Sequence, residues 1–129
     1  MKLDKNFFIS QKFSPAELDK YKKSAKRSLD IAGDSKDPEV IFHFAFMALI
    51  KIGIYCLAQA DHRVKSRPGH HQKIIEYLSQ ALDSKDILII GDKMRKERNL
   101  DFYGGDALCS VEEAREYLKF SHGVLKNFL

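Results

Sequence analysis

An apolar run of nineteen residues, from Val40 to Ala58, occupies the middle of the sequence, and only His43 and Lys51 interrupt it. Its length is close to the roughly 20 residues that a helix needs to cross a bilayer. Lys51, however, lies near its centre, where a charge costs about 3 kcal/mol even on the insertion scale. We therefore interpret the run as a buried core helix that starts after Asp37-Pro38 and ends near Ala60. Because it is apolar on nearly all sides, it needs other helices around it, or a partner subunit on one side.

Four further helices are predicted from start and stop signals. Ser14-Pro15-Ala16-Glu17 combines an N-cap serine, a proline at the first helical position and a glutamate that closes a capping box, and Gly33 ends the segment. A second capping box, Ser110-Val111-Glu112-Glu113, opens a helix that continues to the end of the chain. The other two are expected over residues 69–82 and 84–103. No stretch shows convincing strand alternation, so the sequence predicts an all-α, antiparallel (up-and-down) bundle of about five helices.

The 129 residues predict a single helical domain over residues 14–129, preceded by an arm, residues 1–13, that packs on it. The net charge of +4 tolerates an anionic partner without implying one. Cys56 and Cys109 have neither metal-like nor framework spacing, so we expect two reduced thiols in a cytoplasmic protein. The first five residues lack the apolar run of a secretory signal, and no membrane association is expected.

The segment Lys93–Tyr103 forms the charged last turns of the predicted fourth helix, whose first turns, Ile87 to Ile90, are apolar. At about 100° per residue, Arg98 and Asp101 continue the apolar stripe. A second line beside this stripe consists of Arg95, Asn99 and Tyr103. An apolar face thus becomes a charged one, either because the helix leaves the core there or because it meets a ligand or a second subunit.

Recognition of a phosphate is the chemistry that this segment could support. Arg95 and Arg98 are three residues apart, so they are neighbours on the helix surface and could address one anion, with an amide from Asn99 and a phenol from Tyr103. In the alternative, Arg98 pairs with Asp101 or Glu97 and contributes well under about 1 kcal/mol. Spacing alone favours the alternative.

A basic segment precedes the predicted third helix. From His62 to Lys73 the chain carries four Lys or Arg and three His without an acid, broken by Pro68-Gly69, and we expect a mobile basic loop. His70 and His71 are adjacent and should point away from each other on a helix, and no histidine pair has the spacing of a metal site. We expect no metal and no cofactor. His43 and His122 lie among apolar residues and are expected in the core or at its boundary.

The sequence resembles the HEPN domains, small helical proteins named for nucleotide binding in higher eukaryotes and prokaryotes. The resemblance covers residues 14–128 and rests on Arg98-Asn99 and the following Tyr103, on the first helix with its Ala25-Lys26-Arg27-Ser28-Leu29 segment, and on the loop Arg67-Pro68-Gly69-His70-His71. It implies a bundle that dimerises so that the Arg motifs of two subunits share one cleft. Many members are metal-independent ribonucleases, in which an Arg and a His four to six residues later promote attack of the RNA 2′-hydroxyl on the adjacent phosphate.

This chain departs from the family pattern, because no histidine lies between Lys93 and Ser121 and position 103 is a tyrosine. An unperturbed tyrosine titrates near pH 10, so the usual proton-transfer group is missing. His70 or His71 could supply it from the loop, although nothing in the sequence places them in the cleft.

Three functions follow. The first, which we favour, is a homodimer that binds RNA or a nucleotide, as a degenerate ribonuclease or as one half of a toxin–antitoxin-like pair with a nucleotidyltransferase. The candidate binding residues are Arg67, His70, His71, Arg95, Arg98, Asn99 and Asp101. The second is an active endoribonuclease in which Arg98 stabilises the transition state and Tyr103 positions the phosphate. The third is a helical dimerisation module without catalysis.

Overall fold

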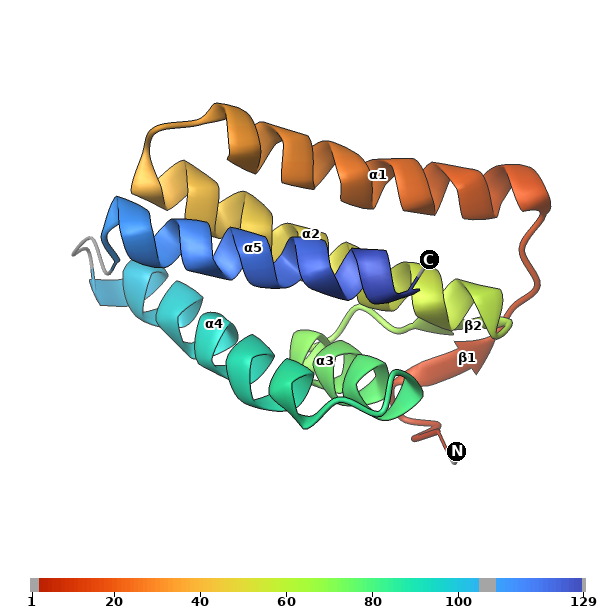
Figure 1. Ribbon diagram of the computed structural model, residues 1–129. Coiled ribbons are helices and arrows are strands. Elements are labelled where there is room, and N and C mark those ends of the chain that lie inside the picture. The colour runs from red at the N-terminus through yellow and green to blue at the C-terminus, as the bar shows by residue number, and fades with distance from the viewer. Residues whose placement is uncertain (1–2, 105–108, 129) are drawn as a thin grey trace.

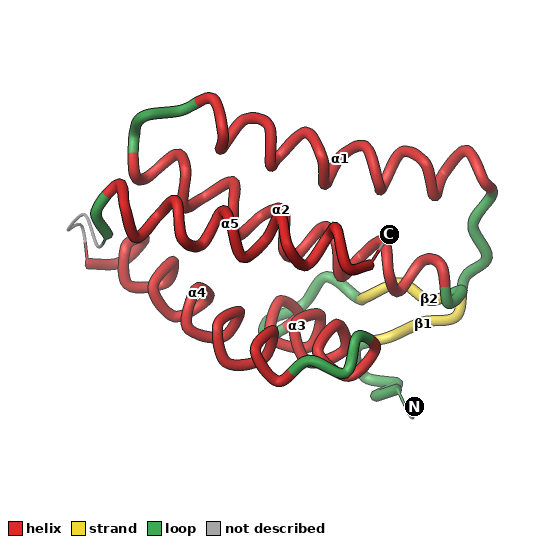
Figure 2. Tube along the Cα trace, in the orientation of Figure 1, coloured by secondary structure: helices red, strands yellow, loops and turns green. Residues whose placement is uncertain are grey.

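The computed structural model describes residues 3–104 and 109–128, except the side chains of residues 100–104, and it is almost entirely helical. The five helices are α1 (Pro15–Asp34), α2 (Pro38–Gln59), α3 (His70–Ala81), α4 (Lys85–Gly104) and α5 (Val111–Phe128). Two strands, β1 (Phe8–Ser10) and β2 (His62–Val64), form a short ribbon beside them (Figures 1 and 2). The prediction of an all-α chain with helices at these places is therefore confirmed.

The two predicted capping boxes are formed. At the start of α1, the backbone N–H of Glu17 donates to Ser14 Oγ at 3.1 Å, and the N–H of Ser14 donates back to the Glu17 carboxylate at 3.0 Å. At the start of α5, the N–H of Glu113 donates to Ser110 Oγ at 3.1 Å. These contacts satisfy N–H groups that have no partner inside the helix, which explains why both helices begin where the sequence indicates.

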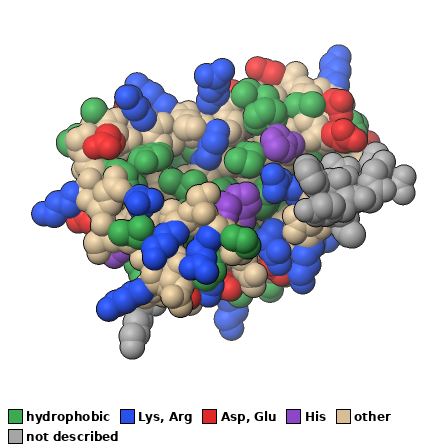
Figure 3. Space-filling view, turned by 180° about the vertical axis from the view of Figure 1, so that it is seen from behind, with side chains coloured by type: hydrophobic (Ala, Val, Ile, Leu, Met, Phe, Trp, Pro, Cys, Tyr) green, Lys and Arg blue, Asp and Glu red, His purple; other side chains and the backbone are tan. Residues whose placement is uncertain are grey.

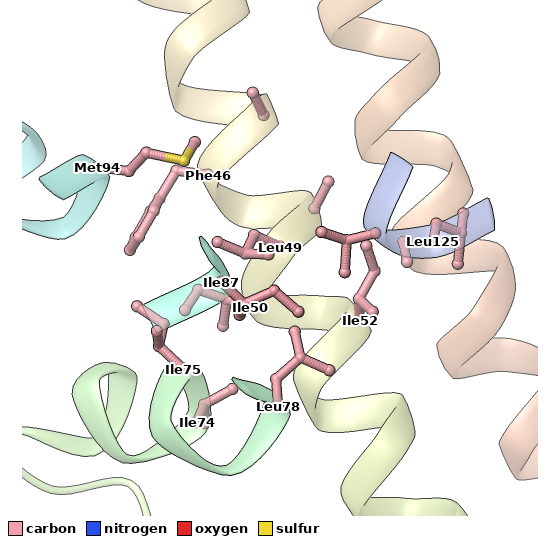
Figure 4. Close-up of a cluster of buried hydrophobic side chains, with 14 of the residues drawn as sticks. Phe46, Leu49, Ile50, Ile52, Ile74, Ile75, Leu78, Ile87, Met94 and Leu125 are labelled. Atoms are coloured by element: carbon pink, nitrogen blue, oxygen red, sulfur yellow. The ribbon is translucent and has the colours of Figure 1, made fainter. Parts of the chain in front are cut away.

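Helix α2 lies at the centre of the bundle. It packs against α1 along its length and against α5, α3 and α4 on other sides. It is long and apolar enough to cross a membrane, but 67% of its most apolar stretch is buried inside the protein. Its fully buried residues form the middle of the core shown in Figure 4, including Phe46, Leu49 and Ile52. The interpretation of this run as a core helix agrees with the structure.

Small residues bring the neighbouring helices close to α2. A Cβ atom at Gly53 would overlap Cγ2 of Ile74 on α3, so this position admits only glycine at the present helix separation. Ser121 on α5 is fully buried, and its hydroxyl donates to the carbonyl oxygen of Ala45 at 2.8 Å. Such a bond satisfies a polar group that would otherwise cost about 1–3 kcal/mol to bury.

The helix directions depart from a strict up-and-down order. α1 and α2 are antiparallel, as a short connection favours, but α2 and α5 lie side by side and run in the same direction (Figure 1). The chain crosses the bundle through β2, α3 and α4 before α5 returns to α2, and this longer excursion allows the parallel pair.

The ribbon corrects two expectations about the polypeptide outside the helices. β1 lies in the N-terminal arm and pairs antiparallel with β2, with Phe8 opposite Val64 and Ser10 opposite His62. No strand was expected, and the basic segment was expected to be a mobile loop. Its beginning is instead fixed by main-chain hydrogen bonds to the arm. Strands of three residues are too short to show a period in the sequence.

Candidate functional site

A hollow of about 430 Å³ lies where the basic segment, which runs into the first turn of α3, faces the second half of α4. Ser66, Arg67, Pro68 and Gly69 line it from before α3, His70, His71 and Gln72 from the first turn of α3, and Arg95, Arg98 and Asn99 from α4. Six of the predicted binding residues therefore lie around one cavity, although they come from two separate parts of the sequence. His70 and His71 line the same hollow as Arg98, which the sequence alone did not establish.

The N-terminal arm holds the basic segment against this hollow. The backbone N–H of Lys65 donates to the carbonyl oxygen of Phe7 at 2.6 Å, and Nη1 of Arg67 donates to the carbonyl oxygen of Asn6 at 2.8 Å. The guanidinium of Arg67 also lies over the ring of Phe7, with Cζ 5.1 Å from the ring centroid. These contacts with the arm fix the position of the Arg67 side chain.

Gly69 makes the turn from this segment into α3. Its φ of 86° lies in the left-handed region, which glycine adopts without strain and other residues disfavour. His70 follows as the first residue of the helix, and its Nδ1 lies 2.7 Å from the carbonyl oxygen of Arg67. Because a carbonyl only accepts, Nδ1 carries the proton, and in the neutral ring Nε2 is the free acceptor.

The two adjacent histidines lie together rather than apart. Their ring centroids are 4.3 Å from each other, which corrects the expectation that they would point in different directions. The helical geometry assumed for that expectation does not hold at the first residue of a helix, where the Arg67 carbonyl fixes the ring of His70. His71 in turn packs edge-on against Phe46 of α2, at 5.7 Å between ring centroids.

His71 is neutral at pH 7 in this setting. Burial lowers the pKa of its imidazole to about 4, and electrostatic interactions with His70, Arg98 and Arg95 act in the same direction. A neutral imidazole can accept a proton or a hydrogen bond from a ligand. The positive charges of Arg95 and Arg98 also favour the binding of an anion in the hollow.

Arg98 carries a charge that no described carboxylate neutralises. Its guanidinium lies over the buried ring of Phe46, with Cζ 5.6 Å from the ring centroid. Glu97, one of the two acids proposed as its partner, instead accepts a hydrogen bond from the Tyr117 hydroxyl at 2.9 Å. The other proposed acid, Asp101, lies with Tyr103 outside the described side chains, so their predicted roles remain predictions.

Arg95 differs from Arg98 because it forms an ion pair. Its Nε and Nη2 donate to Oδ1 of Asp92 at 3.0 and 2.8 Å, and Lys96 lies 3.1 Å from the other carboxylate oxygen. These contacts keep the pKa of the Asp92 carboxyl below its usual range. Within the hollow, Arg98 is therefore the stronger candidate to hold an anion, and Arg95 is held at its side.

The chain matches no known family model, no curated protein and no solved structure. The site must therefore be judged on its own geometry.

Two contributors to the site were missed in the sequence. Phe46 supports both Arg98 and His71 from a position that looked like ordinary core. His43, expected in the core or at its boundary, is exposed, and the charge of Arg98 is one cause of its lowered pKa, after burial. His122 is exposed as well. Since His43 and Phe46 are three residues apart on α2, helical spacing could have linked them once one of them was known to face Arg98.

Two other described features, the Cys56 thiol and a second hollow, lack the arginines and histidines of this site. Burial raises the pKa of the Cys56 thiol to about 11, as expected for an unreactive core cysteine. Among residues 3–99 and 109–128, no three His, Cys, Asp or Glu side chains are grouped to hold a metal ion. A larger hollow of about 660 Å³ lies between α4 and α5, and its described lining is mainly apolar and includes none of the predicted site residues.

Proposed function

We propose that this protein binds the phosphate of RNA or of a nucleotide in the hollow between the basic segment and α4. The observation that carries the proposal is the convergence of Arg67, Arg98 and Asn99 with the His70–His71 pair on one cavity. Arginine offers paired donors that match phosphate oxygens, and charge-assisted hydrogen bonds contribute about 1.5–3 kcal/mol each. The resemblance to HEPN domains supports the same ligand class.

The charge of Arg98, which no described carboxylate neutralises, strengthens the proposal. Placing a cation in a partly buried hollow without a described carboxylate beside it is unfavourable unless another anion completes the site. The ring of Phe46 offsets part of this cost through a cation–π contact worth about 0.5–2 kcal/mol. A bound phosphate would supply negative charge beside Arg98.

Binding can be tested by titrating labelled RNA and labelled ATP in fluorescence anisotropy. We expect Arg98→Ala to weaken binding at least about tenfold, since one charge-assisted bond is lost. Lys126→Ala, which removes an exposed charge from α5, is the matched control and should leave the affinity unchanged. Equal affinities for the parent protein and Arg98→Ala would reject this site.

A second candidate function, metal-independent cleavage of RNA, is favoured by one observation: His70 and His71 lie in the same hollow as Arg98. The family motif lacks its histidine here, and these two could take its place. In its neutral form His70 presents Nε2 as an acceptor and could take the proton of a 2′-hydroxyl as that oxygen attacks the phosphate, while Arg98 stabilises the phosphorane-like transition state. The P–O5′ bond then breaks to leave a 2′,3′-cyclic phosphate, and the leaving 5′-oxygen takes a proton from the imidazolium or from water. His71, whose pKa of about 4 makes it a weak base, could accept a hydrogen bond from the substrate.

Incubating the pure protein with RNA in the presence of a chelator separates the two candidates. Cleavage by the parent protein that is lost in Arg98→Ala and in His70→Ala/His71→Ala would establish catalysis. Binding without cleavage would leave the phosphate-binding function standing alone. If neither occurs, the site serves another purpose, such as the purely structural dimerisation module.

We also propose that the protein is a homodimer. Two large apolar side chains on α4, Leu88 and Ile89, are 42% and 65% exposed. Leu88 lies on the same face of α4 as Arg95 and Asn99, so a second copy that covers it would lie alongside the hollow. Sedimentation of the parent protein should show a dimer at micromolar concentration, and Leu88→Lys/Ile89→Lys should convert it to a monomer. A monomeric parent protein would reject the proposal.

The proposed cellular setting is cytoplasmic, with a nucleotidyltransferase as partner in a toxin–antitoxin-like pair. This rests on the resemblance to HEPN domains. A gene for a small nucleotidyltransferase next to the gene for this chain, and co-purification of the two proteins, would support it.

A further inference from the structure

Positive groups continue from the hollow across the surface of α2 to α1. The charges of Arg98 and of Lys51 both act on His43 of α2. Burial and, in turn, the charge of Arg27 on α1 lower the pKa of Lys51. Arg98, Lys51 and Arg27 are cations, whereas the lowered pKa of His43 leaves its imidazole neutral at pH 7. Among the described side chains, no carboxylate acts on His43 or Lys51. Figure 3 views the molecule from behind and shows Lys, Arg and His side chains over its centre, with acidic side chains toward the margins.

Lys51 stands out among these groups because it is half-buried. Its ammonium donates to the hydroxyl of Ser28, itself only 1% exposed, at 2.8 Å. Burial and the nearby Arg27 lower the pKa of this amine. Within residues 3–99 and 109–128, Lys51 forms no ion pair. A lysine placed near the centre of an apolar helix is costly unless a counter-charge is present at least part of the time.

One side of α2 is only partly buried and provides apolar surface between Arg98 and Lys51. The residues of α2 between Val40 and Ile54 that are not buried share one stripe: Val40, His43, Phe44, Met47, Lys51 and Ile54. The opposite side of the helix packs on α5, where Phe42 stacks edge-on against Tyr117 at 5.4 Å. The stripe therefore places the cation Lys51 and the neutral imidazole of His43 among an aromatic ring and aliphatic side chains, a combination that suits single-stranded nucleic acid, whose phosphates are charged and whose bases stack.

We propose that the ligand of the hollow is a single strand of nucleic acid, and that it continues from Arg98 over His43 and Phe44 to a second phosphate subsite at Lys51 and Arg27. This inference rests on the proposed function, since the strand enters through the Arg98 site. His43 and Lys51 are eight residues apart on α2, about 12 Å at 1.5 Å per residue. A stacked strand advances about 3.4 Å per nucleotide, so the stripe spans about three to four nucleotides. A mononucleotide would not reach from the hollow to Lys51.

The length of the ligand provides the test. Anisotropy titrations compare a labelled dinucleotide with a labelled dodecamer, both as 2′-O-methyl RNA so that cleavage cannot occur. We expect the parent protein to bind the dodecamer at least about tenfold more tightly. Lys51→Met keeps the aliphatic stem that packs in the protein and removes the charge. It should weaken dodecamer binding about fivefold to tenfold, lower the salt dependence by the equivalent of one phosphate contact, and leave dinucleotide binding unchanged.

Three comparisons make the result decisive. Lys126→Met on α5 is the matched control and should bind both ligands as the parent protein does, and Arg27→Ala should repeat the selective loss at a second position. Thermal unfolding confirms that each variant is folded. Suppose that Lys51→Met binds the dodecamer with unchanged affinity, while Arg98→Ala loses the binding of both ligands. This result would overturn the proposed path of the strand to Lys51 and leave the Arg98 site intact.

Two other outcomes would also overturn it. A dodecamer that binds no better than the dinucleotide would show that nothing beyond the hollow contributes. A change in sedimentation of Lys51→Met without a change in dodecamer affinity would assign the stripe to a subunit contact. If Arg98→Ala binds both ligands normally, the proposed function itself fails, and this result is distinct from the others.

Discussion

The guanidinium of Arg98 lies over the ring of Phe46, and Phe46 is completely buried. The core of the bundle thus forms the floor of the candidate site, and Met94, also fully buried, lies beside the same ring (Figure 4). This arrangement supports a flexible cationic side chain on an aromatic ring, and no carboxylate among the described side chains cancels its charge. The consequence is that a substitution in the core should change binding.

Phe46→Leu tests this link. Leucine retains most of the buried apolar surface but removes the aromatic face, so we expect RNA or nucleotide binding to weaken about threefold to tenfold through loss of a cation–π contact of about 0.5–1.5 kcal/mol. Phe42→Leu is the control, since Phe42 is also buried on α2 but stacks on Tyr117 instead. Isothermal titration of both variants is the measurement. Equal losses in the two variants would mean that general loosening of the core, and not the ring below Arg98, determines the affinity.

The second prediction concerns Gly69, whose φ of 86° shapes the turn into α3. Gly69→Ala should lower stability by about 1 kcal/mol, because an L-residue is strained in the left-handed region. It should also weaken ligand binding, since Arg67 and His70 on either side would move. Gly69→Asn is the matched variant, because asparagine tolerates this conformation better, and it should retain most of both properties. Denaturant unfolding and anisotropy titration measure the two effects, and equal behaviour of Ala and Asn would argue against backbone strain.

The third prediction is a pH dependence caused by His71. Its pKa is about 4 in the folded protein, against an ordinary value of 6.5, so between these pH values the unfolded chain binds more protons. The free energy of unfolding should therefore fall as the pH is lowered from 6.5 to 4, by up to about 3 kcal/mol at about 1.4 kcal/mol per pKa unit. Above pH 6.5 this contribution is fully present.

Chemical denaturation of the parent protein and His71→Gln across this range measures the contribution as a difference between two curves. The variant should lose part of the pH dependence, whereas His122→Gln, which removes an exposed histidine from α5, should retain it. Parallel curves for the parent protein and His71→Gln would show that His71 titrates alike in the folded and unfolded states.

The helices could be predicted because each signal lies within a few residues of its effect. Ser14 and Glu17, or Ser110 and Glu113, form their capping boxes locally, so the sequence alone identifies the helix starts. The β1–β2 ribbon could not be predicted, because Phe8 and Val64 pair across more than fifty residues and each strand is only three residues long.

In the candidate site, too, local groupings could be predicted from the sequence, whereas long-range contacts could not. Arg95, Arg98 and Asn99 could be grouped from helical spacing, and the basic segment from its composition. Their meeting depends on tertiary structure: the arm fixes Arg67, Gly69 sets the turn, and α3 packs on α4. Phe46 and His43 were missed because nothing in an apolar helix marks which of its sides remains near a charge.

The fourth prediction concerns the contact between α2 and α3 that brings the His70–His71 pair to the bundle. Gly53→Ala would drive a Cβ atom into Cγ2 of Ile74 and should cost about 1–3 kcal/mol of stability, as overpacking does. Gly33→Ala is the control, because no atom lies within 4 Å of an added Cβ there, and in a helix it should be neutral or stabilising by up to about 1 kcal/mol. Thermal unfolding measures both.

A double variant distinguishes this contact from other effects. Ile74→Leu removes the branch at Cβ that Gly53→Ala would strike, so Gly53→Ala/Ile74→Leu should be more stable than the sum of the two single changes predicts, by about 0.5–2 kcal/mol. Strict additivity would place the cost of Gly53→Ala elsewhere. Because α3 begins at His70, the same double variant should also recover ligand affinity lost in Gly53→Ala, which would link the helix separation to the geometry of the site.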